Sequence, residues 1–409
     1  KFLRCVFGCS VHVLLVVVFI YIYIYISRPS NKNNKFEESM SLPEDVVYEI
    51  LSRLPVKSLM RFRCVCKSWS GLVKTPKFIS KHLNTRRISD NKDIACLLVS
   101  RRDNITNKRV ISLSTNDSIT FVDQHLPVPF LNENFGHIRL LGPSNGIVCL
   151  YGFPDNIALW NPAIRDFKIL PAASPTPRPP GLKVRGGDLG FGFDSKTNDY
   201  KVVQILFCCS NQLQVEIYNL RTDSWRKYNG VMPAKIMYNI NVWSMAYKND
   251  IFCWWAHEDD VEVILSFDMS HEMFQKTQLP SNINIGLLGG EHRTVRAIVP
   301  LNESISLIVY HLKQVEKFFD IWVMKEFGIE ESWTRLSTIG PLSRVERPLG
   351  FWKNGELILE NSSGQLVMYD PGKQQTKSLG LHGKRDRLEV LIYKESLVSI
   401  SRGTKLSVI

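Results

Sequence analysis

The sequence predicts a small all-α module followed by an all-β, propeller-like domain. Three observations lead to this fold class. Residues 41–73 show two amphipathic helical patterns, residues after 94 change to short alternating strands, and five strand-turn-strand segments recur at a similar spacing. With 409 residues, 44% of them hydrophobic, the chain can bury one large core and one small one.

The N-terminal segment, residues 1–39, contains an uncharged stretch at residues 5–26 that is long enough to cross a bilayer. Two features argue against an anchor: the first methionine is Met40, and the repeat YIYIYI is what an alternating T/A tract encodes in frame. We therefore interpret residues 1–39 as a non-native leader, with a membrane-anchoring hydrophobic segment as the alternative. Without its five basic and two acidic residues, the net charge falls from +12 to +9, which suits an acidic partner surface.

The first helical pattern lies in SLPEDVVYEILSRLP, residues 41–55. Pro43 suits a first helical turn, and the acidic pair that follows it complements the positive end of the helix dipole. Apolar residues recur at helical spacing, at Val47, Ile50, Leu51 and Leu54. The pattern predicts one amphipathic helix that ends at Pro55.

The second helical pattern covers residues 56–73 and predicts one helix that Thr75-Pro76 closes. It contains RFRCVCKSW, with two cysteines one residue apart. On a helix, Cys64 and Cys66 would lie about 200° apart, so we expect that they cannot share a metal ion. We interpret Cys66 as a small apolar residue of the buried stripe. Two such helices expose more apolar surface than they can bury in each other, which implies a partner.

These residues closely resemble the F-box, over almost its whole length. The matching motifs are Leu42-Pro43, Ile50-Leu51, LPVKSL at residues 54–59 and CKSW at residues 66–69. The resemblance implies docking onto the Skp-family adaptor of a cullin-based ubiquitin ligase. It also implies which residues contact the adaptor or fix the helices. These are Leu42, Pro43, Ile50, Leu51, Leu54, Pro55, Leu59, Val65, Cys66, Lys67 and Trp69. We place the F-box domain at residues 40–83 and a charged linker at residues 84–93.

The predicted β domain, residues 94–409, has a repeating plan. Its five segments step by 45 to 58 residues when the following residues are taken as equivalent: Trp160, Tyr218, Phe267, Met324 and Tyr369. That spacing fits one four-stranded propeller blade per repeat, with a shorter blade before the series at residues 96–114. The apolar pair in VLIYKESLVSI, residues 390–400, is suited to close the ring against the first blade. We predict six blades, with seven as the alternative.

The β domain resembles the F-box-associated domain of plant F-box proteins across nearly all of its length. The motifs include GPSNGIVCLYGFPDNIALWNPAIRDFKILP, LGFGFDSKTNDYKVVQI and EIYNLRTDSWRKY. Within that group the chain is most similar to S-locus F-box-like proteins, and next to F-box/kelch-type immune regulators, although the double-glycine kelch signature is not evident. The resemblance implies that the domain holds a substrate protein for ubiquitin transfer.

Several stretches have residue types that also occur in chemical sites. We interpret GGDLGFGFD, residues 186–194, as a strand and not a nucleotide cradle, and residues 257–260 as a hairpin tip and not a metal site. We place Cys208 and Cys209 on opposite faces of a strand, residues 174–181 in a rigid loop, and Trp243, Trp254 and Trp255 in the core. The sequence indicates no catalytic residues, no metal site and no cofactor.

The sequence therefore predicts a non-catalytic substrate receptor of a Skp-cullin-F-box ubiquitin ligase. It is expected to bind the Skp-family adaptor, through it a cullin, and an unidentified target protein, but neither nucleic acid nor a membrane. The alternatives are an S-locus role in pollen recognition of style ribonucleases, a propeller enzyme and a membrane-anchored scaffold. Nine scattered cysteines favour a reducing compartment, which we expect to be the cytoplasm, the nucleus or both.

Overall fold

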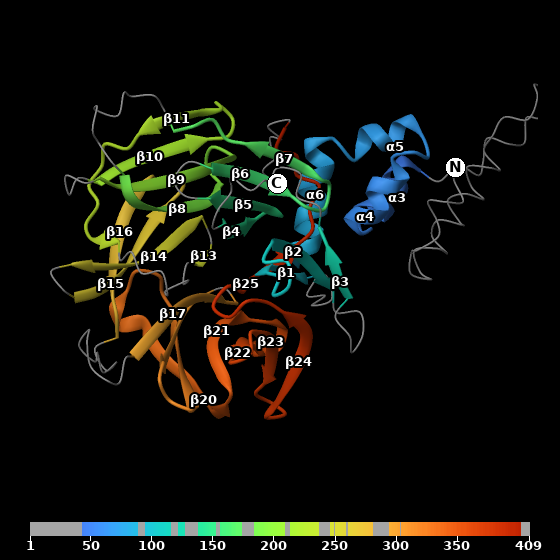
Figure 1. Cartoon of the computed structure of the whole chain (residues 1–409). Helices are drawn as coiled ribbons and strands as arrows, with labels where there is room; N and C mark the ends of the chain where they lie inside the picture. The colour runs from blue at the N-terminus through green and yellow to red at the C-terminus, as the bar shows by residue number, and fades with distance from the viewer. Residues whose placement is uncertain are drawn as a thin grey trace, which may run out of the picture. The chain divides into compact units, whose positions relative to one another are not determined.

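The computed structural model of the chain contains two compact units (Figure 1). The first unit holds the N-terminal helices together with residues 161–166 and the C-terminal segment 395–401, and the second holds the remaining strands. The structure describes residues 43–88, 95–115, 122–126, 138–152, 156–173, 184–208, 213–236, 246–248, 250–258, 261–280, 294–302 and 304–401. The segment 1–39 lies outside these residues. Within them, no helix has the length and apolar character needed to span a bilayer.

The first unit has four helices in its described part: α3 (Glu44–Ser52), α4 (Val56–Phe62), α5 (Lys67–Leu72) and α6 (Pro76–Ile88). The predicted all-α module is confirmed. Its buried apolar side chains include Leu51, Val56, Leu59, Phe62, Val73, Phe78 and Ile79. The helix α6 continues to Ile88, into the residues 84–93 that are predicted to form a linker.

The C-terminal segment, residues 395–401, is held to the turn at residues 161–166 by a set of hydrogen bonds. The buried Asn161 side chain donates to the carbonyls of Ser396 at 3.1 Å and Val398 at 2.8 Å. Asp166 accepts from the Ser399 hydroxyl and the Ile400 amide. Burial alone raises the pKa of Asp166, but these hydrogen bonds hold it below its usual value.

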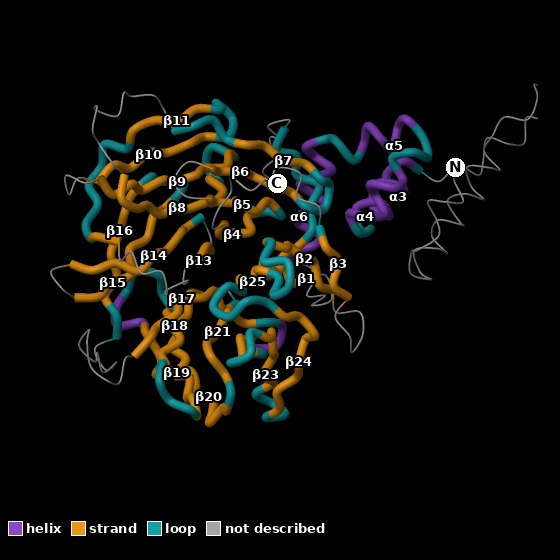
Figure 2. The backbone as a smooth tube through the Cα atoms, viewed as in Figure 1, coloured by secondary structure: helices purple, strands orange, loops and turns teal. Residues whose placement is uncertain are grey.

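The second unit consists of six antiparallel sheets, coloured orange in Figure 2. Blade 1 is β25 (Glu389–Lys394), β1 (Ala95–Arg102), β2 (Arg109–Thr115) and β3 (Val122–His125). Blade 2 is β4 (Ile138–Ser144), β5 (Ile147–Gly152), β6 (Asn156–Asn161) and β7 (Asp166–Ile169). Blade 3 is β8 (Val184–Asp194), β9 (Asp199–Cys208), β10 (Leu213–Asn219) and β11 (Ser224–Lys227).

The remaining three blades follow the same order with additions. In blade 4, β14 (Ile251–Glu258) pairs along one edge with both β12 (Lys235–Ile236) and β13 (Ala246–Lys248), and it continues to β15 (Val261–Asp268) and β16 (Met273–Gln278). Blade 5 is β17 (Thr294–Leu301), β18 (Ser304–His311), β19 (Glu316–Met324) and β20 (Trp333–Ser343), with η3 (Glu330–Ser332) before the last strand. Blade 6 is β21 (Val345–Phe351), β22 (Leu357–Asn361), β23 (Gln365–Asp370) and β24 (Gln375–His382), with η4 (Lys353–Gly355) in its first connection.

The ring of blades closes where the last strand joins the first. β25 pairs antiparallel with β1, in a register that sets Leu97 opposite Ile392. The innermost strands contact their neighbours in turn, from β25 to β4, β8 and β14, and from β13 to β17, β21 and back to β25. The six-bladed propeller and its closure by the strand in VLIYKESLVSI are therefore confirmed, and the seven-bladed alternative is wrong.

The repeat in the sequence corresponds to one place in each blade. Trp160, Tyr218, Phe267 and Tyr369 are the second-to-last residues of the third strands of blades 2, 3, 4 and 6. Met324 ends its strand, but it pairs with Trp333 as Tyr218 pairs with Trp225. The turn that follows is also shared by blades 2, 3, 4 and 6. In each of these turns an Asn or Asp is followed, four positions later, by a residue with positive φ. These residues are Arg165, Asp223, Glu272 and Gln374.

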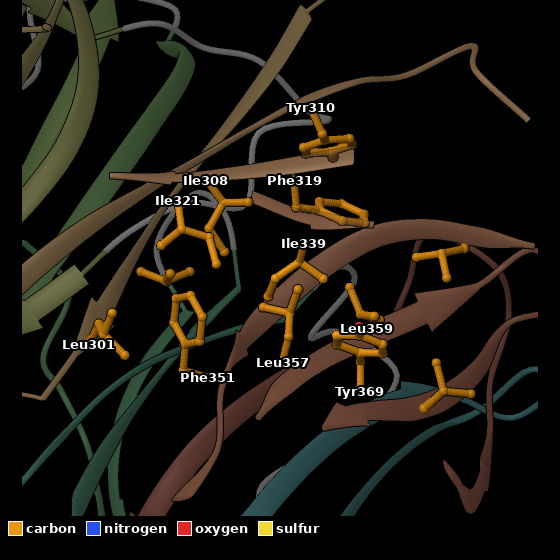
Figure 3. Packing of buried hydrophobic residues seen from close by; sticks show 13 residues of the cluster. Leu301, Ile308, Tyr310, Phe319, Ile321, Ile339, Phe351, Leu357, Leu359 and Tyr369 are labelled. Atoms are coloured by element: carbon orange, nitrogen blue, oxygen red, sulfur yellow. The ribbon is translucent and has the colours of Figure 1, made fainter. Parts of the chain in front are cut away.

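Apolar side chains fill the space between neighbouring blades. Figure 3 shows this for blades 5 and 6, where Phe319 and Ile321 from β19 pack with Leu357 and Leu359 from β22. Phe319, Leu357 and Leu359 are fully buried. Because a strand alternates its faces, the inner strand β22 contributes to two such layers. Leu357 and Leu359 pack toward blade 5, and Ile358 between them belongs to a cluster with residues of blade 1.

Charged side chains also join neighbouring blades around the ring. Each junction pairs a charged group of one blade with a charge or a backbone group of the next. The junctions are Glu389 with the Leu140 amide, Arg139 with Asp188, Lys201 with the Met269 carbonyl, Glu262 with Arg296, Lys317 with the Val345 carbonyl, and Arg347 with the Leu388 carbonyl. Burial raises the pKa of Asp188 and of Glu389, although Arg139 acts on both in the opposite direction.

Gly190 of β8 leaves space for a tryptophan of the next blade. A Cβ atom at residue 190 would lie 2.6 Å from Cζ2 of Trp254, which is fully buried. We expect Gly190→Ala to lower the free energy of unfolding by about 1 to 3 kcal/mol, because the well-packed core cannot absorb the added methyl group. Urea titration measures this. Gly372→Ala is the control, since the one atom near its new Cβ is the flexible Asp370 Oδ1 at 3.3 Å. Equal effects of the two changes would contradict the packing argument.

Candidate adaptor-binding site

The first helix of the module begins as the sequence predicts. Pro43 is the N-cap of α3, and Glu44 and Asp45 occupy its first turn, where negative charge complements the helix dipole. Leu51 points into the core and is fully buried, whereas the neighbouring Ile50 is half-buried. The predicted helix boundary at Pro55 is also confirmed, since α3 ends at Ser52 and Pro55 is the N-cap of α4.

The single helix predicted for residues 56–73 is wrong. The structure has α4 and α5 there, separated by a turn at residues 63–65 and by Cys66 in an extended conformation. In the turn, the Val65 amide donates to the Phe62 carbonyl at 2.9 Å, a shorter hydrogen-bond step than that of an α-helix. The Arg-Cys-Val-Cys sequence favours such a break, because Cys and Val have weaker helix propensity than Ala or Leu.

Because the chain is not helical at residues 63–66, the different directions of the Cys64 and Cys66 side chains have another cause than the one predicted. The Cys64 thiol is exposed and donates to the Arg61 carbonyl at 2.9 Å, whereas the Cys66 sulfur is half-buried and lies 3.2 Å from the Ser68 hydroxyl. Their directions follow from the turn and not from a helical angle. Across the described part of the chain, no group of three or more His, Cys, Asp and Glu side chains is arranged to hold a metal ion.

The helix α6 was missed because Thr75-Pro76 was interpreted as a helix end. The Thr75 hydroxyl accepts from the Phe78 amide at 3.3 Å, and Pro76 is the first residue of the helix, so the pair is a start signal. The buried His82 of α6 donates from Nε2 to the Leu54 carbonyl at 2.9 Å. This bond satisfies a carbonyl in the short connection between α3 and α4, and it ties α6 to that connection.

The predicted adaptor-binding residues divide into two groups by burial. Leu51, Leu54 and Leu59 are buried in the module and hold its helices together. Exposed or half-exposed side chains belong to Pro43, Ile50, Pro55, Val65, Cys66, Lys67 and Trp69, which we name the adaptor surface. Leu42 lies outside the described residues. Trp69 packs on one side against Phe62, with the ring centroids 6.2 Å apart. Binding of an adaptor by the adaptor surface stays a prediction.

The helical module is also basic. Between Glu44 and Lys81 the sequence has eight Lys and Arg but three Asp and Glu. Glu49 is engaged within the module, because Lys81 lies 2.9 Å from it and Arg53 3.9 Å, and the hydrogen bond from Lys81 holds its pKa below its usual value. Lys57, Lys67 and Lys77 are exposed, so the module presents positive charge to a partner.

The other predicted sites have structural roles in the described residues. Residues 186–194 lie in strand β8, and Trp254 and Trp255 are buried, so the predicted strand and the predicted core positions are confirmed. β14 and β15 form the hairpin predicted at residues 257–260, whose last two residues are outside the described part. Cys209, residues 174–181 and Trp243 also lie outside it.

Two domain families match this arrangement. Residues 40–81 match the F-box domain family, and residues 98–400 match the family described as F-box associated beta propeller domain. An F-box/kelch-repeat protein of Arabidopsis thaliana is 30% identical over 338 residues, covering 81% of this chain and 88% of its own length. The F-box protein CPR1 of the same plant is 24% identical, covering 89% of this chain and 90% of its own.

The comparison with solved structures gives distant matches. AofleA from Arthrobotrys oligospora superposes with a TM-score of 0.40 and 10% identity, over 75% of this chain and 91% of its own. The family matches together cover most of the described residues, one on the helical module and one on the propeller. The chain therefore belongs to the F-box proteins that carry an F-box-associated β-propeller domain.

Proposed function

We propose that this chain is the substrate-recognition subunit of a Skp-cullin-F-box ubiquitin ligase. The F-box domain implies binding to a Skp-type adaptor. The observation that carries the proposal is the adaptor surface, where the apolar side chains of Ile50, Val65 and Trp69 stay accessible on a module too small to cover them. The propeller is the part that holds the target protein.

The proposed role needs no bond chemistry from the chain itself. A receptor that binds the adaptor with one domain and the target with the other raises the local concentration of the target near the activated ubiquitin. F-box proteins as a class act in this way as adaptors. We also propose that the chain works in the cytoplasm, the nucleus or both, which the free thiols of Cys149 and Cys253 support. The S-locus, enzyme and scaffold alternatives stay predictions without a supporting observation in the described residues.

The proposal is tested by reconstitution. Full-length chain mixed with a recombinant Skp-family adaptor should co-elute from a size-exclusion column, and the complex should then recruit a cullin. Because Lys57, Lys67 and Lys77 are exposed, we expect the affinity for an acidic adaptor surface to fall as salt is raised. Separate elution of the two proteins at low salt would contradict the proposed role.

A further inference from the structure

A surface groove lies between blades 3 and 4 of the propeller. Its walls are residues 226–231, at and after the outermost strand β11, and residues 272–274, where the turn of blade 4 leads into β16. The groove has a volume of about 540 Å³. That volume lies within the range of sites that take a small molecule or a few side chains of a peptide.

The walls of the groove are fixed by a buried ion network. Lys201, which is 3% exposed, lies 2.5 Å from Asp194 and 2.7 Å from Glu272, and it donates to the Met269 carbonyl at 2.7 Å. Glu272 also pairs with Arg226 across the groove. Burial raises the pKa of Glu272, but the hydrogen bonds from Lys201 and Arg226 outweigh it and hold the pKa below its usual value. The network joins β9 to the turn of blade 4.

Aromatic rings form the floor behind these charges. The Tyr228 ring meets Phe274 edge to face at 5.3 Å, and both contact Phe267, which is fully buried. A groove whose walls are already ordered loses little conformational entropy when it binds a ligand. The groove is therefore a preformed site and not a gap between mobile side chains.

The exposed groups of the groove are apolar and positive. Val231 is 81% exposed and Met273 is 49% exposed. Lys227 is exposed, and its side chain has no hydrogen-bond or ion-pair partner among the described residues. Glu272 is the one carboxylate of the lining, and together with Asp194 it balances the charges of Lys201 and Arg226. The positive charge that remains uncompensated is that of Lys227.

We propose that this groove binds a short segment of the target protein in which an acidic side chain stands next to an aliphatic one. The carboxylate of the peptide pairs with Lys227, which follows Arg226 in the groove wall. The aliphatic side chain of the peptide packs on Met273 and Val231. A nucleic acid fits less well, because binding a polyanion needs several free cations and the groove offers one besides the paired Arg226. That the ligand is a ubiquitination target rests on the function proposed above.

The test uses two bead-bound libraries of eight-residue peptides and the full-length chain. The first library combines Asp and Glu with Leu, Ile, Val, Ser and Gly, and the second replaces the acidic residues by Lys and Arg. We expect retention on the first library alone. Lys227→Glu combined with Met273→Glu should weaken binding to the selected peptides by roughly tenfold or more.

Two matched controls separate the groove from general surface effects. Val261→Glu changes a residue of the same blade that is also 49% exposed, and Lys196→Glu reverses an exposed lysine in a turn of blade 3. Both should bind the selected peptides normally. The proposal is overturned if the acidic library retains nothing, if the groove variant binds as well as the controls, or if an oligothymidine probe binds the groove as strongly as the peptides. Adaptor pull-down of the same variants reports on the proposed function separately, because the groove lies in the other unit.

Discussion

Replacing Trp69 by alanine is expected to weaken adaptor binding by about 30-fold to a thousandfold while the helices stay folded. Truncating a central aromatic anchor of an interface commonly costs about 2 to 4 kcal/mol, which corresponds to that range of affinity. Trp69 is half-exposed and rests on Phe62, so its indole is held in place and still accessible. Calorimetric titration of the full-length variant with the adaptor measures the loss, and circular dichroism confirms that the helices remain.

Two companion variants separate contact from folding. Lys196→Ala alters an exposed lysine of the propeller, in the other unit, and should bind the adaptor as well as the parent chain. Leu51→Ala removes a fully buried side chain, so it should lower the stability of the module by about 2 to 5 kcal/mol and weaken binding only through unfolding. Normal adaptor affinity of Trp69→Ala would show that the adaptor surface is wrongly placed.

Arg347→Leu is expected to destabilise the propeller by about 3 to 5 kcal/mol. Arg347 lies 2.8 Å from Glu360 and also donates to the Leu388 carbonyl at 2.8 Å, next to the strand that closes the ring. The Glu360 side chain is fully buried, and removing its partner leaves an uncompensated charge in the core. Urea unfolding measures the loss. Arg335→Leu is the control, because its pair with Asp320 is exposed and should contribute no more than about 1 kcal/mol.

The stability deficit of Arg347→Leu should depend on pH. Burial already raises the pKa of Glu360, and Arg347 opposes that rise, so its removal raises the pKa further. A carboxyl whose pKa is raised in the folded state does not reduce the free energy of unfolding while it is protonated in both the folded and the unfolded state. The reduction grows as pH rises from the unfolded-state pKa toward the folded-state pKa. The deficit relative to the parent chain should therefore shrink as pH falls from neutral toward the usual carboxyl range. Arg347→Leu with Glu360→Leu should recover much of the loss, and a deficit that the second change leaves untouched would contradict the buried-charge argument.

The architecture was readable from the sequence because four of the six blades repeat one local device. An aromatic residue near the end of the third strand, an Asn or Asp after it, and a left-handed residue four positions later recur, as at Tyr369, Asp370 and Gln374. These residues act within a few positions of each other, so a single chain displays them directly. The short strands β12 and β13 of blade 4 follow no such pattern and were not predicted.

The candidate site was predicted less completely. The motif positions of the F-box were found, but motif positions do not distinguish a buried leucine such as Leu59 from an accessible tryptophan such as Trp69. Helical periodicity also continued across residues 63–66, where the chain forms a turn. The junctions between blades lay beyond sequence reasoning, because Arg139 and Asp188 meet only after two blades have packed.

The pairing of β25 with β1 sets an order of events during synthesis. The ribosome makes β1 before the other strands of the ring, and it makes β25 after all of them. Until Lys394 has left the exit tunnel, the inner edge of β1 has no partner and is open to pairing with another chain. The F-box helices are made before all of these strands. Nascent chains that have the F-box helices but no closed propeller are therefore a regular stage in making this protein, and a chain truncated before Glu389 stays at that stage.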